Sequence, residues 1–415
     1  MKSVAVTRIA LGSCRALVLL VGLFSTPAQA FVEDITAVFR PDPGNPMVNK
    51  FENTTPQSGI CPGHIPARCK AMNIFTIRRS FPLASSNQPI AANADDPRKG
   101  AYFKVPSTWR DFQVTHRSTG ETETVQMRIA GVGARWNVAY PPGVSAWKTP
   151  STAWSTPWRN GPAPCQGVNY LAAGASFALF FWIVPENAGA CSVIAGDDIP
   201  WMTYSTFEYA YELRTPNPLT MSAGEYTGSL TYTMAPGGDF DFGDVMQPSD
   251  PVATFNFQLS VEHALKIDIP PGGNRVELIP QGGWQAWLNH GRAPARLYRD
   301  QTFRIAASSR FKMQLECSIV MGNTCGLRNA EGDEVPLQVA VTLPNGLVDQ
   351  YGQAVNTLPL RLDGVGSELF QPSRYVNDRP GSLHFEVQRG DMGEMLKRPG
   401  STYSGVVTVV WDSQV

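Results

Sequence analysis

The feature that constrains the fold most is the last strand-like stretch of the chain, residues 400–412, which reads GSTYSGVVTVVWD. Successive side chains of a β-strand face opposite sides, so this stretch is apolar on both faces. One face carries Tyr403, Gly405, Val407, Val409 and Trp411, and the other carries Val406, Thr408 and Val410. Such a strand belongs in the middle of a β-sandwich, yet only three residues follow it. We therefore expect another chain to supply the missing neighbour.

A short phrase of this strand, Tyr-x-Gly-x-x-Thr, occurs twice, at 226–231 and at 403–408. After the first copy the chain continues into 252–261, where apolar and polar residues alternate, but the second copy has no such continuation. We interpret this pattern as two β-sandwich domains, residues 31–263 and 264–415, of which the second ends one strand early. The alternative is that so short a phrase recurs by accident in β-strands.

The first thirty residues have the pattern of a secretory signal. Basic residues precede an apolar run at 16–24, and the small-x-small sequence Ala-Gln-Ala follows at 28–30. We therefore expect residues 1–30 to be a cleaved signal peptide and the mature, exported chain to begin at Phe31. The longest apolar run beyond it, residues 171–184, is too short to cross a bilayer and predicts one or two buried strands.

The mature chain contains an even number of cysteines: Cys61, Cys69, Cys165, Cys191, Cys317 and Cys325. An even count in an exported chain indicates disulfides, although six cysteines formally allow about fifteen pairings. Proximity along the chain favours Cys61–Cys69, Cys165–Cys191 and Cys317–Cys325. The alternative is a metal site, but the sequence around His64 lacks the paired Cys-x-x-Cys spacing of structural zinc. We therefore expect no metal and no cofactor.

The composition predicts an all-β protein. With 37 glycines and 34 prolines, the chain consists of short apolar segments broken by turn residues, and helical periodicity is rare. The clearest predicted strands lie at 73–78, 111–116, 124–129, 205–213, 252–261, 266–269 and 337–343. Short helices are expected only at 283–290 and 392–398.

At three places the chain resembles the CblD-like minor pilins, which are the tip adhesins of the alternate chaperone–usher class on cable pili and colonisation-factor fimbriae. Residues 254–270 resemble the interdomain passage of that family, and residues 297–317 resemble a strand of its second domain. Residues 399–409, PGSTYSGVVTV, resemble its terminal strand. The resemblance covers nearly the whole chain by organisation, but it reaches the level of motifs only at the interdomain passage and the C-terminus.

The resemblance implies an N-terminal adhesin domain and a C-terminal pilin domain, both immunoglobulin-like, of which the second lacks its last strand. A periplasmic chaperone, then the major pilin, would donate that strand, and an outer-membrane usher would export the subunit to the fimbrium tip at the cell surface. The expected donor-strand groove is lined by Tyr403, Val407, Val409 and Trp411. A partner of this kind also removes the aggregation hazard of an open strand edge.

One departure from the family concerns the receptor. Related adhesins place adjacent basic residues after the last strand phrase of the adhesin domain, whereas residues 234–244 of this chain read MAPGGDFDFGD and are acidic. Their binding site is therefore not transferred to this chain. The acidic turn also lacks the glycine that a calcium-binding EF-hand loop needs at its sixth position, where Asp244 stands.

An aromatic segment before Cys165 is the candidate receptor site. It contains Trp136, Tyr140, Trp147, Trp154, Trp158 and Arg159. Exposed aromatic rings stack on sugars while arginine binds hydroxyls or carboxylates, so Trp147, Trp154, Trp158 and Arg159 are candidates for binding a host glycan or protein. The alternative, which we favour, is that these rings fill the core, because tryptophan is buried on average.

Other function classes find little support. The chain has 34 basic and 35 acidic residues without a basic block, which argues against nucleic acid as a partner. Its five histidines, at 64, 116, 263, 290 and 384, are scattered, and no hydrolase or nucleotide-binding motif is present, so we expect no enzyme. The alternatives to a tip adhesin are a structural pilus initiator that binds no receptor and a secreted carbohydrate-active β-sandwich enzyme.

Overall fold

The computed structural model describes residues 31–85, 89–291, 294–398 and 400–413, so the expected signal peptide at 1–30 lies outside the described residues. The described chain consists mainly of β-strands with short helices at the turns, which confirms the all-β fold class. No described helix is long and apolar enough to span a membrane.

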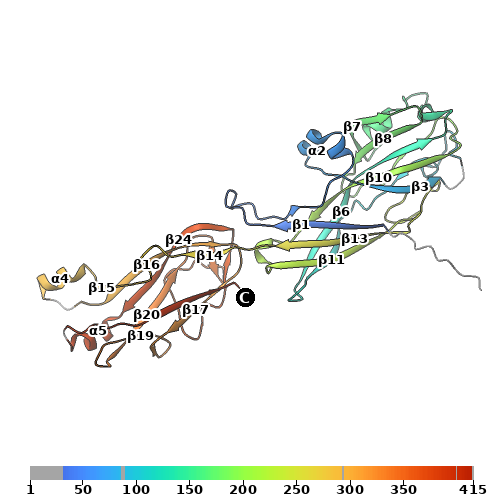
Figure 1. Ribbon diagram of the computed structural model, residues 1–415. Helices are drawn as coiled ribbons and strands as arrows, with labels where there is room; N and C mark the ends of the chain where they lie inside the picture. Colours follow the sequence, from blue (N-terminus) through green and yellow to red (C-terminus); the bar gives the residue numbers. More distant parts are fainter. Residues whose placement is uncertain (1–30, 86–88, 292–293, 399, 414–415) are drawn as a thin grey trace, which may run out of the picture.

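The strands of residues 31–261 form one large sheet and one small pair (Figure 1). The large sheet runs in the order β12-β3-β10-β6-β5-β11-β13-β1-β2, and β8 joins it beside β6 and carries β7 on its other edge. Its strands are β1 (Phe31–Phe39), β2 (Glu52–Asn53), β3 (Ile77–Ser85), β5 (Arg110–His116), β6 (Thr122–Val138), β7 (Gln166–Ala173), β8 (Phe177–Ile183), β10 (Met202–Arg214), β11 (Gly224–Thr233), β12 (Met246–Pro248) and β13 (Val252–Val261). The small pair is β4 (Ala101–Phe103) with β9 (Cys191–Val193), and the helices are α1 (Ile60–Gly63), α2 (Pro66–Met72) and α3 (Thr156–Asn160).

The strands of residues 265–412 form separate sheets. The largest contains β14 (Leu265–Asp268), β15 (Ile279–Pro280), β16 (Leu297–Ala307), β18 (Val320–Met321), β19 (Thr324–Arg328), β20 (Glu334–Thr342), β22 (Leu358–Pro359) and β24 (Val376–Val387). Two further pairs are β17 (Lys312–Cys317) with β25 (Val407–Asp412), and β21 (Leu347–Asp349) with β23 (Phe370–Pro372). The helices of this part are α4 (Gly283–His290) and α5 (Arg389–Leu396).

Each group of strands has its own hydrophobic core. The larger cluster of buried side chains draws only on residues 31–261 and is rich in aromatic rings, among them Trp136, Trp182 and Phe180. The second cluster draws only on residues 297–392, and side chains from the flanking segments pack against it. The two groups of strands lie end to end in Figure 1.

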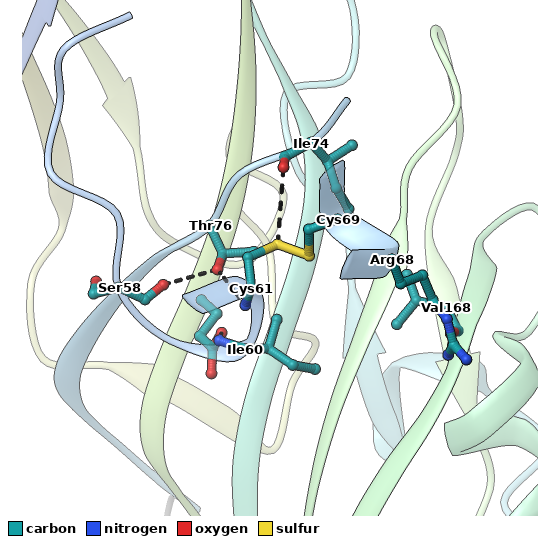
Figure 2. Close-up of a disulfide and its surroundings, with 9 residues drawn as sticks. Ser58, Ile60, Cys61, Arg68, Cys69, Ile74, Thr76 and Val168 are labelled. Atoms are coloured by element: carbon teal, nitrogen blue, oxygen red, sulfur yellow. Dashed lines mark hydrogen bonds between the residues drawn. A yellow bond between two sulfur atoms is a disulfide. The ribbon is translucent and has the colours of Figure 1, made fainter. Parts of the chain in front are cut away.

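The structure contains three disulfides, Cys61–Cys69, Cys165–Cys191 and Cys317–Cys325, the pairs that sequence proximity indicates. Figure 2 shows the first of them, which joins α1 to α2 above the sheet. The Cys61 amide donates to Thr76 Oγ1, whose hydroxyl donates to the Ser58 carbonyl, so the loop before α1 is tied to the start of β3. This staple holds two helices of 4 and 7 residues that are too short to be stable alone.

Most of the predicted strands are present with small changes of boundary. The predicted strand 252–261 coincides with β13, and those at 111–116, 124–129 and 205–213 lie within β5, β6 and β10. The prediction at 73–78 was wrong for its first four residues, because Asn73 adopts a left-handed conformation that ends α2 and β3 begins only at Ile77. The apolar run 171–184 divides between the end of β7 and β8.

Candidate functional site

The terminal strand β25 pairs with one described strand only. It runs antiparallel to β17, with Val409 opposite Leu315 and Trp411 opposite Met313. The first copy of the Tyr-x-Gly-x-x-Thr phrase differs, because in β11 it is paired on both sides, Tyr226 with Leu259 of β13 and with His116 of β5. Among the described strands, β25 therefore has a free edge where β11 has a neighbour.

The backbone groups at this free edge can be assigned from the ladder. The Val406 carbonyl accepts from the Ser318 amide, so Val406 faces β17. Hydrogen-bonding direction alternates along an antiparallel strand, so Val407, Val409 and Trp411 point their amides and carbonyls away from β17. Their N–H and C=O groups have no partner within the described chain. A row of unpaired backbone groups of this kind is a template for another strand.

The same three residues direct their side chains at the second core, together with Tyr403. All four expected groove residues pack against the cluster but stay half-buried, whereas Val339 and Val341 of the central strand β20 are 1% and 0% exposed. The Tyr403 hydroxyl is buried without a hydrogen-bond partner in the described structure. The core is therefore closed at its centre and incompletely covered beside β25.

Other half-buried apolar side chains of this core come from the start of the second group. Leu265 and Ile267 lie on β14, and Val276 and Leu278 precede β15. Two segments far apart in the sequence thus contribute half-buried side chains to the same core.

The aromatic segment proved to be mostly core. Trp136, Trp147 and Trp158 are at most 1% exposed, and the Trp158 ring stacks on Trp182 with centroids 5.6 Å apart. The Trp182 Nε1–H donates to the Trp158 carbonyl, which anchors the cluster. Trp147 and Trp158 therefore have no surface to offer a receptor, because their apolar rings gain more from the core than from water.

The remaining candidates of that segment are more accessible. Trp154 is half-buried at the edge of the first core, and Arg159 on α3 is exposed. Tyr140, two residues after the end of β6, is 72% exposed. The structure therefore separates the predicted cluster into buried tryptophans and a few surface side chains.

A cleft of about 570 Å³ lies at the end of the first group where β5 begins and β11 ends. Its lining includes two cations, Lys104 and Arg110, and one carboxylate, Asp239. Arg110 lies over the Tyr232 ring at 5.1 Å and 3.5 Å from Asp239, while Lys104 Nζ donates to the Gly238 carbonyl. The cleft thus combines charged donors and an acceptor with aromatic walls.

Trp109 forms another wall of this cleft. The Arg214 guanidinium lies 4.0 Å from its ring centroid and the Arg128 guanidinium lies 5.6 Å away, which holds the indole in place. The Trp109 Nε1–H and the Tyr232 hydroxyl are buried, without a partner in the described structure, and so do not face the cleft. The charged groups that the cleft offers to a ligand are those of Lys104, Arg110 and Asp239.

A buried carboxylate of the acidic turn 234–244, that of Asp241, is used in hydrogen bonds within the protein. Asp241 accepts from Arg98 at 2.7 Å and from the amides of Gly237 and Gly243. Burial alone would raise the pKa of Asp241, but these donors hold it below its ordinary value. No group of three metal-binding side chains occurs among the described residues.

In the second group of strands, His384 is the centre of a hydrogen-bonded chain with an aspartate and a threonine. His384 Nδ1 contacts Asp300 at 2.7 Å and its Nε2 contacts Thr342 at 2.8 Å. Asp300 and His384 face each other across β16 and β24, and Thr342 also accepts from the Thr357 amide. These contacts join neighbouring strands, so we interpret the chain as a polar cross-strand ladder.

No protein-family model and no characterised protein matches this chain in sequence. Solved structures give distant likenesses that span nearly whole chains. A chaperone–tip adhesin complex of CFA/I fimbriae is 11% identical, covers 93% of this chain and 97% of that chain, and has a TM-score of 0.26. The adhesin CfaE of enterotoxigenic Escherichia coli is 12% identical, covers 92% of both chains and has a TM-score of 0.23. The CsuC–CsuE chaperone–tip complex of Acinetobacter baumannii is 10% identical, covers 92% of this chain and 98% of that chain, and has a TM-score of 0.22.

At these TM-scores the likeness carries no functional argument, so the function has to follow from β25 and the cleft.

Proposed function

We propose that this protein is the minor tip subunit of a chaperone–usher pilus. Residues 264–415 accept a donor strand and so initiate assembly, and residues 31–263 mediate adhesion. The observation that carries the proposal is the free edge of β25, where unpaired backbone groups border a half-covered core. A donated strand satisfies both needs, since it pairs with the edge and buries the apolar side chains below it.

The division into two domains has its own support. Each group of strands has a separate core, and among the described strands no sheet combines members of both groups. Between Val261 of β13 and Leu265 of β14 only three residues connect the groups. We propose an immunoglobulin-like sandwich for each domain, with the second short of its last strand.

The partners follow from the open edge. A subunit with such an edge needs a periplasmic chaperone to cover it, an outer-membrane usher to export it and the major pilin to replace the chaperone. In this proposal the protein lies at the fimbrium tip, and the next subunit fills its acceptor groove. The three disulfides agree with an oxidising compartment.

The decisive experiment restores the missing strand. The N-terminal segment of the major pilin is fused after Val415 through a short turn linker, and the mature chain is expressed with and without it. At about 25 cal/mol per Å², burying a few hundred Å² of apolar surface gains on the order of 10 kcal/mol before ordering costs. The fused chain should be a soluble monomer with a cooperative melting transition, and the unfused chain should aggregate.

A fusion with the same residues in scrambled order is the control. It should behave like the unfused chain, because its apolar residues no longer alternate to match the groove. If the unfused chain already melts cooperatively at the temperature of the fusion, the second domain is complete and the pilin assignment fails.

For adhesion we propose the cleft between Lys104, Trp109 and Arg110 as the receptor site, with a glycan as its ligand. Its support is the combination of charged side chains, Lys104, Arg110 and Asp239, with rigid aromatic walls. Binding of the fused full chain to a glycan array should weaken at least tenfold in Arg110→Ala. The variant Arg159→Ala, which changes an exposed side chain of α3, is the matched control and should bind normally.

If Arg159→Ala alone loses glycan binding, the receptor site lies in the aromatic segment instead of the cleft. If neither glycans nor host cells bind the folded chain, the purely structural initiator becomes the better description.

A further inference from the structure

The connection between the two groups of strands is short and specific. Glu262 continues the ladder of β13, because its amide donates to the Phe39 carbonyl. Just beyond β16, the Ser308 amide donates to the Ala264 carbonyl, and the Ala264 amide donates to Ser308 Oγ. Between them lies His263, which is half-buried. Its ring packs against Phe39 with centroids 5.8 Å apart.

Both ring nitrogens of His263 are used, each toward a different group of strands. Nε2 lies 2.9 Å from the Met221 carbonyl, which belongs to the first group, and Nδ1 lies 3.1 Å from Ser308 Oγ of the second. A carbonyl only accepts, so Nε2 carries the proton and Nδ1 accepts from the Ser308 hydroxyl. The Ser308 oxygen in turn accepts from the Ala264 amide. This hydrogen-bond chain requires a neutral histidine.

A protonated ring does not fit the same geometry. Its new Nδ1–H would point at Ser308 Oγ, whose own hydrogen would then need another acceptor although Ser308 is 0% exposed. A buried donor without a partner is costly, and so is a buried positive charge. We call residues 262–264 and Ser308 the joint, and we call it closed when His263 makes both hydrogen bonds. Protonation of His263 therefore opposes the closed joint.

The charged groups around the joint do not relieve that charge. Arg310 of the second group adds a second positive charge near the ring, and it is 3.9 Å from Glu121, its partner in the first group. The positive charge of Arg310 also acts on the carboxylate of Glu123. Glu262, next to the ring in sequence, is already paired with Arg40 at 2.7 Å. No carboxylate of the described elements contacts the imidazole.

We propose that His263 is a pH-sensitive latch that holds the two groups of strands together when neutral and releases them when the ring is protonated. The proposal rests on the two hydrogen bonds of the ring and does not depend on donor-strand acceptance.

The direction of the pH dependence follows from linkage. Burial lowers the pKa of His263 below its ordinary value, Arg310 acts in the same direction, and the Met221 carbonyl only partly opposes them. In the open joint the ring regains its ordinary pKa of about 6.5. The open form therefore binds the proton more tightly, and closure weakens as the pH falls below about 6.5, by at most about tenfold per pH unit.

The test is hydrogen exchange by mass spectrometry on the full mature chain, with the fused donor segment if solubility requires it. Protection of peptides covering 262–266 and 306–310, corrected for the intrinsic effect of pH on exchange, should fall several-fold between about pH 7.5 and about pH 5. Peptides from the core strand β6 should stay protected, which separates release of the joint from unfolding.

Two histidine variants decide the outcome. His263→Gln should show protection of the joint that no longer depends on pH, because an amide does not titrate. His384→Gln, which removes a hydrogen-bonded histidine far from the joint in sequence, should keep the wild-type response. Protection in the wild type that is constant over this range, or an equal slope in His263→Gln, would overturn the latch.

Discussion

Trp411 of β25 lies edge-on to Phe303 of β16, with ring centroids 5.1 Å apart. It also contacts Phe311 at 5.7 Å, so this one half-buried side chain links the terminal strand to the opposite sheet. The contact gives β25 its only large aromatic anchor in the second core. The rest of its core-facing surface is valine, which a neighbouring strand would cover.

Trp411→Ala should therefore destabilise the donor-complemented chain by about 2–3 kcal/mol, below the roughly 3–5 kcal/mol of a fully buried ring. Tyr351→Ala is the control, because Tyr351 is 78% exposed and its truncation should change stability by no more than about 0.5 kcal/mol. Denaturant titration measures both. Equal losses would mean that Trp411 does not anchor the strand.

The predicted strands that matched best are those with strict alternation. In β13 the burial alternates along nearly its whole length, and the same alternation is visible in residues 252–261 of the sequence. Helices α1 and α2 were missed, because residues 60–72 have no apolar period and a disulfide holds them. A covalent constraint of this kind leaves no periodic signal.

The candidate sites divide in the same way. The period of a strand alone shows which side chains of 403–411 share a face. It does not show that this stretch pairs with β17, since the partners of Val407 and Trp411 lie 90 and 98 residues earlier (407 − 317 and 411 − 313). For Trp147 and Trp158 the sequence favoured the core, and both are buried. It left a sugar site open as the alternative, because a large aromatic side chain suits either environment. The cleft depends on Lys104, Arg110 and 237–239, which only the fold brings together.

The disulfides should differ in their effect on stability. The Cys165–Cys191 bond closes a loop with a sequence separation of 26, against 8 for Cys61–Cys69. On the chain-entropy estimate, replacing both cysteines of the longer loop by serine should cost about 3–4 kcal/mol, and the shorter loop about 2–3 kcal/mol. Urea titration of the two double variants gives the order, and a larger loss for Cys61–Cys69 would contradict it.

A buried ion pair supports the first core beneath α1. Glu208 is 0% exposed, accepts from Arg78 Nε at 2.6 Å and from the Ile60 amide at 2.8 Å. Burial raises the pKa of Glu208 above its ordinary value, although Arg78 and the amide lower it. Arg78→Ala should cost roughly 3–5 kcal/mol, because it leaves a buried carboxylate without its cation.

The same substitution on a Glu208→Gln background should cost less, since the amide has no charge to leave unpaired. Arg304→Ala provides the comparison at the surface, where Arg304 and Asp378 are 50% and 55% exposed and the loss should be at most about 1 kcal/mol. Thermal denaturation of the four variants completes the test. Additive losses for Arg78 and Glu208 would mean that the two side chains act independently.

The last prediction concerns the two faces of β25. Val409 is half-buried against the second core, and Thr408 beside it is exposed on the other face. In the donor-fused chain, Val409→Asp places a carboxylate where the donated strand closes the core, so the charge would be buried without a partner. Thr408→Asp adds the same charge one residue away but leaves it in water. Val409→Asp should no longer give a soluble monomer that melts cooperatively. Thr408→Asp should still give one, with a melting temperature within a few degrees of the parent, because a surface substitution changes stability by at most about 0.5 kcal/mol. Size-exclusion chromatography and calorimetry measure both properties. Equal behaviour of the two variants would show that the donated strand does not lie over Val409.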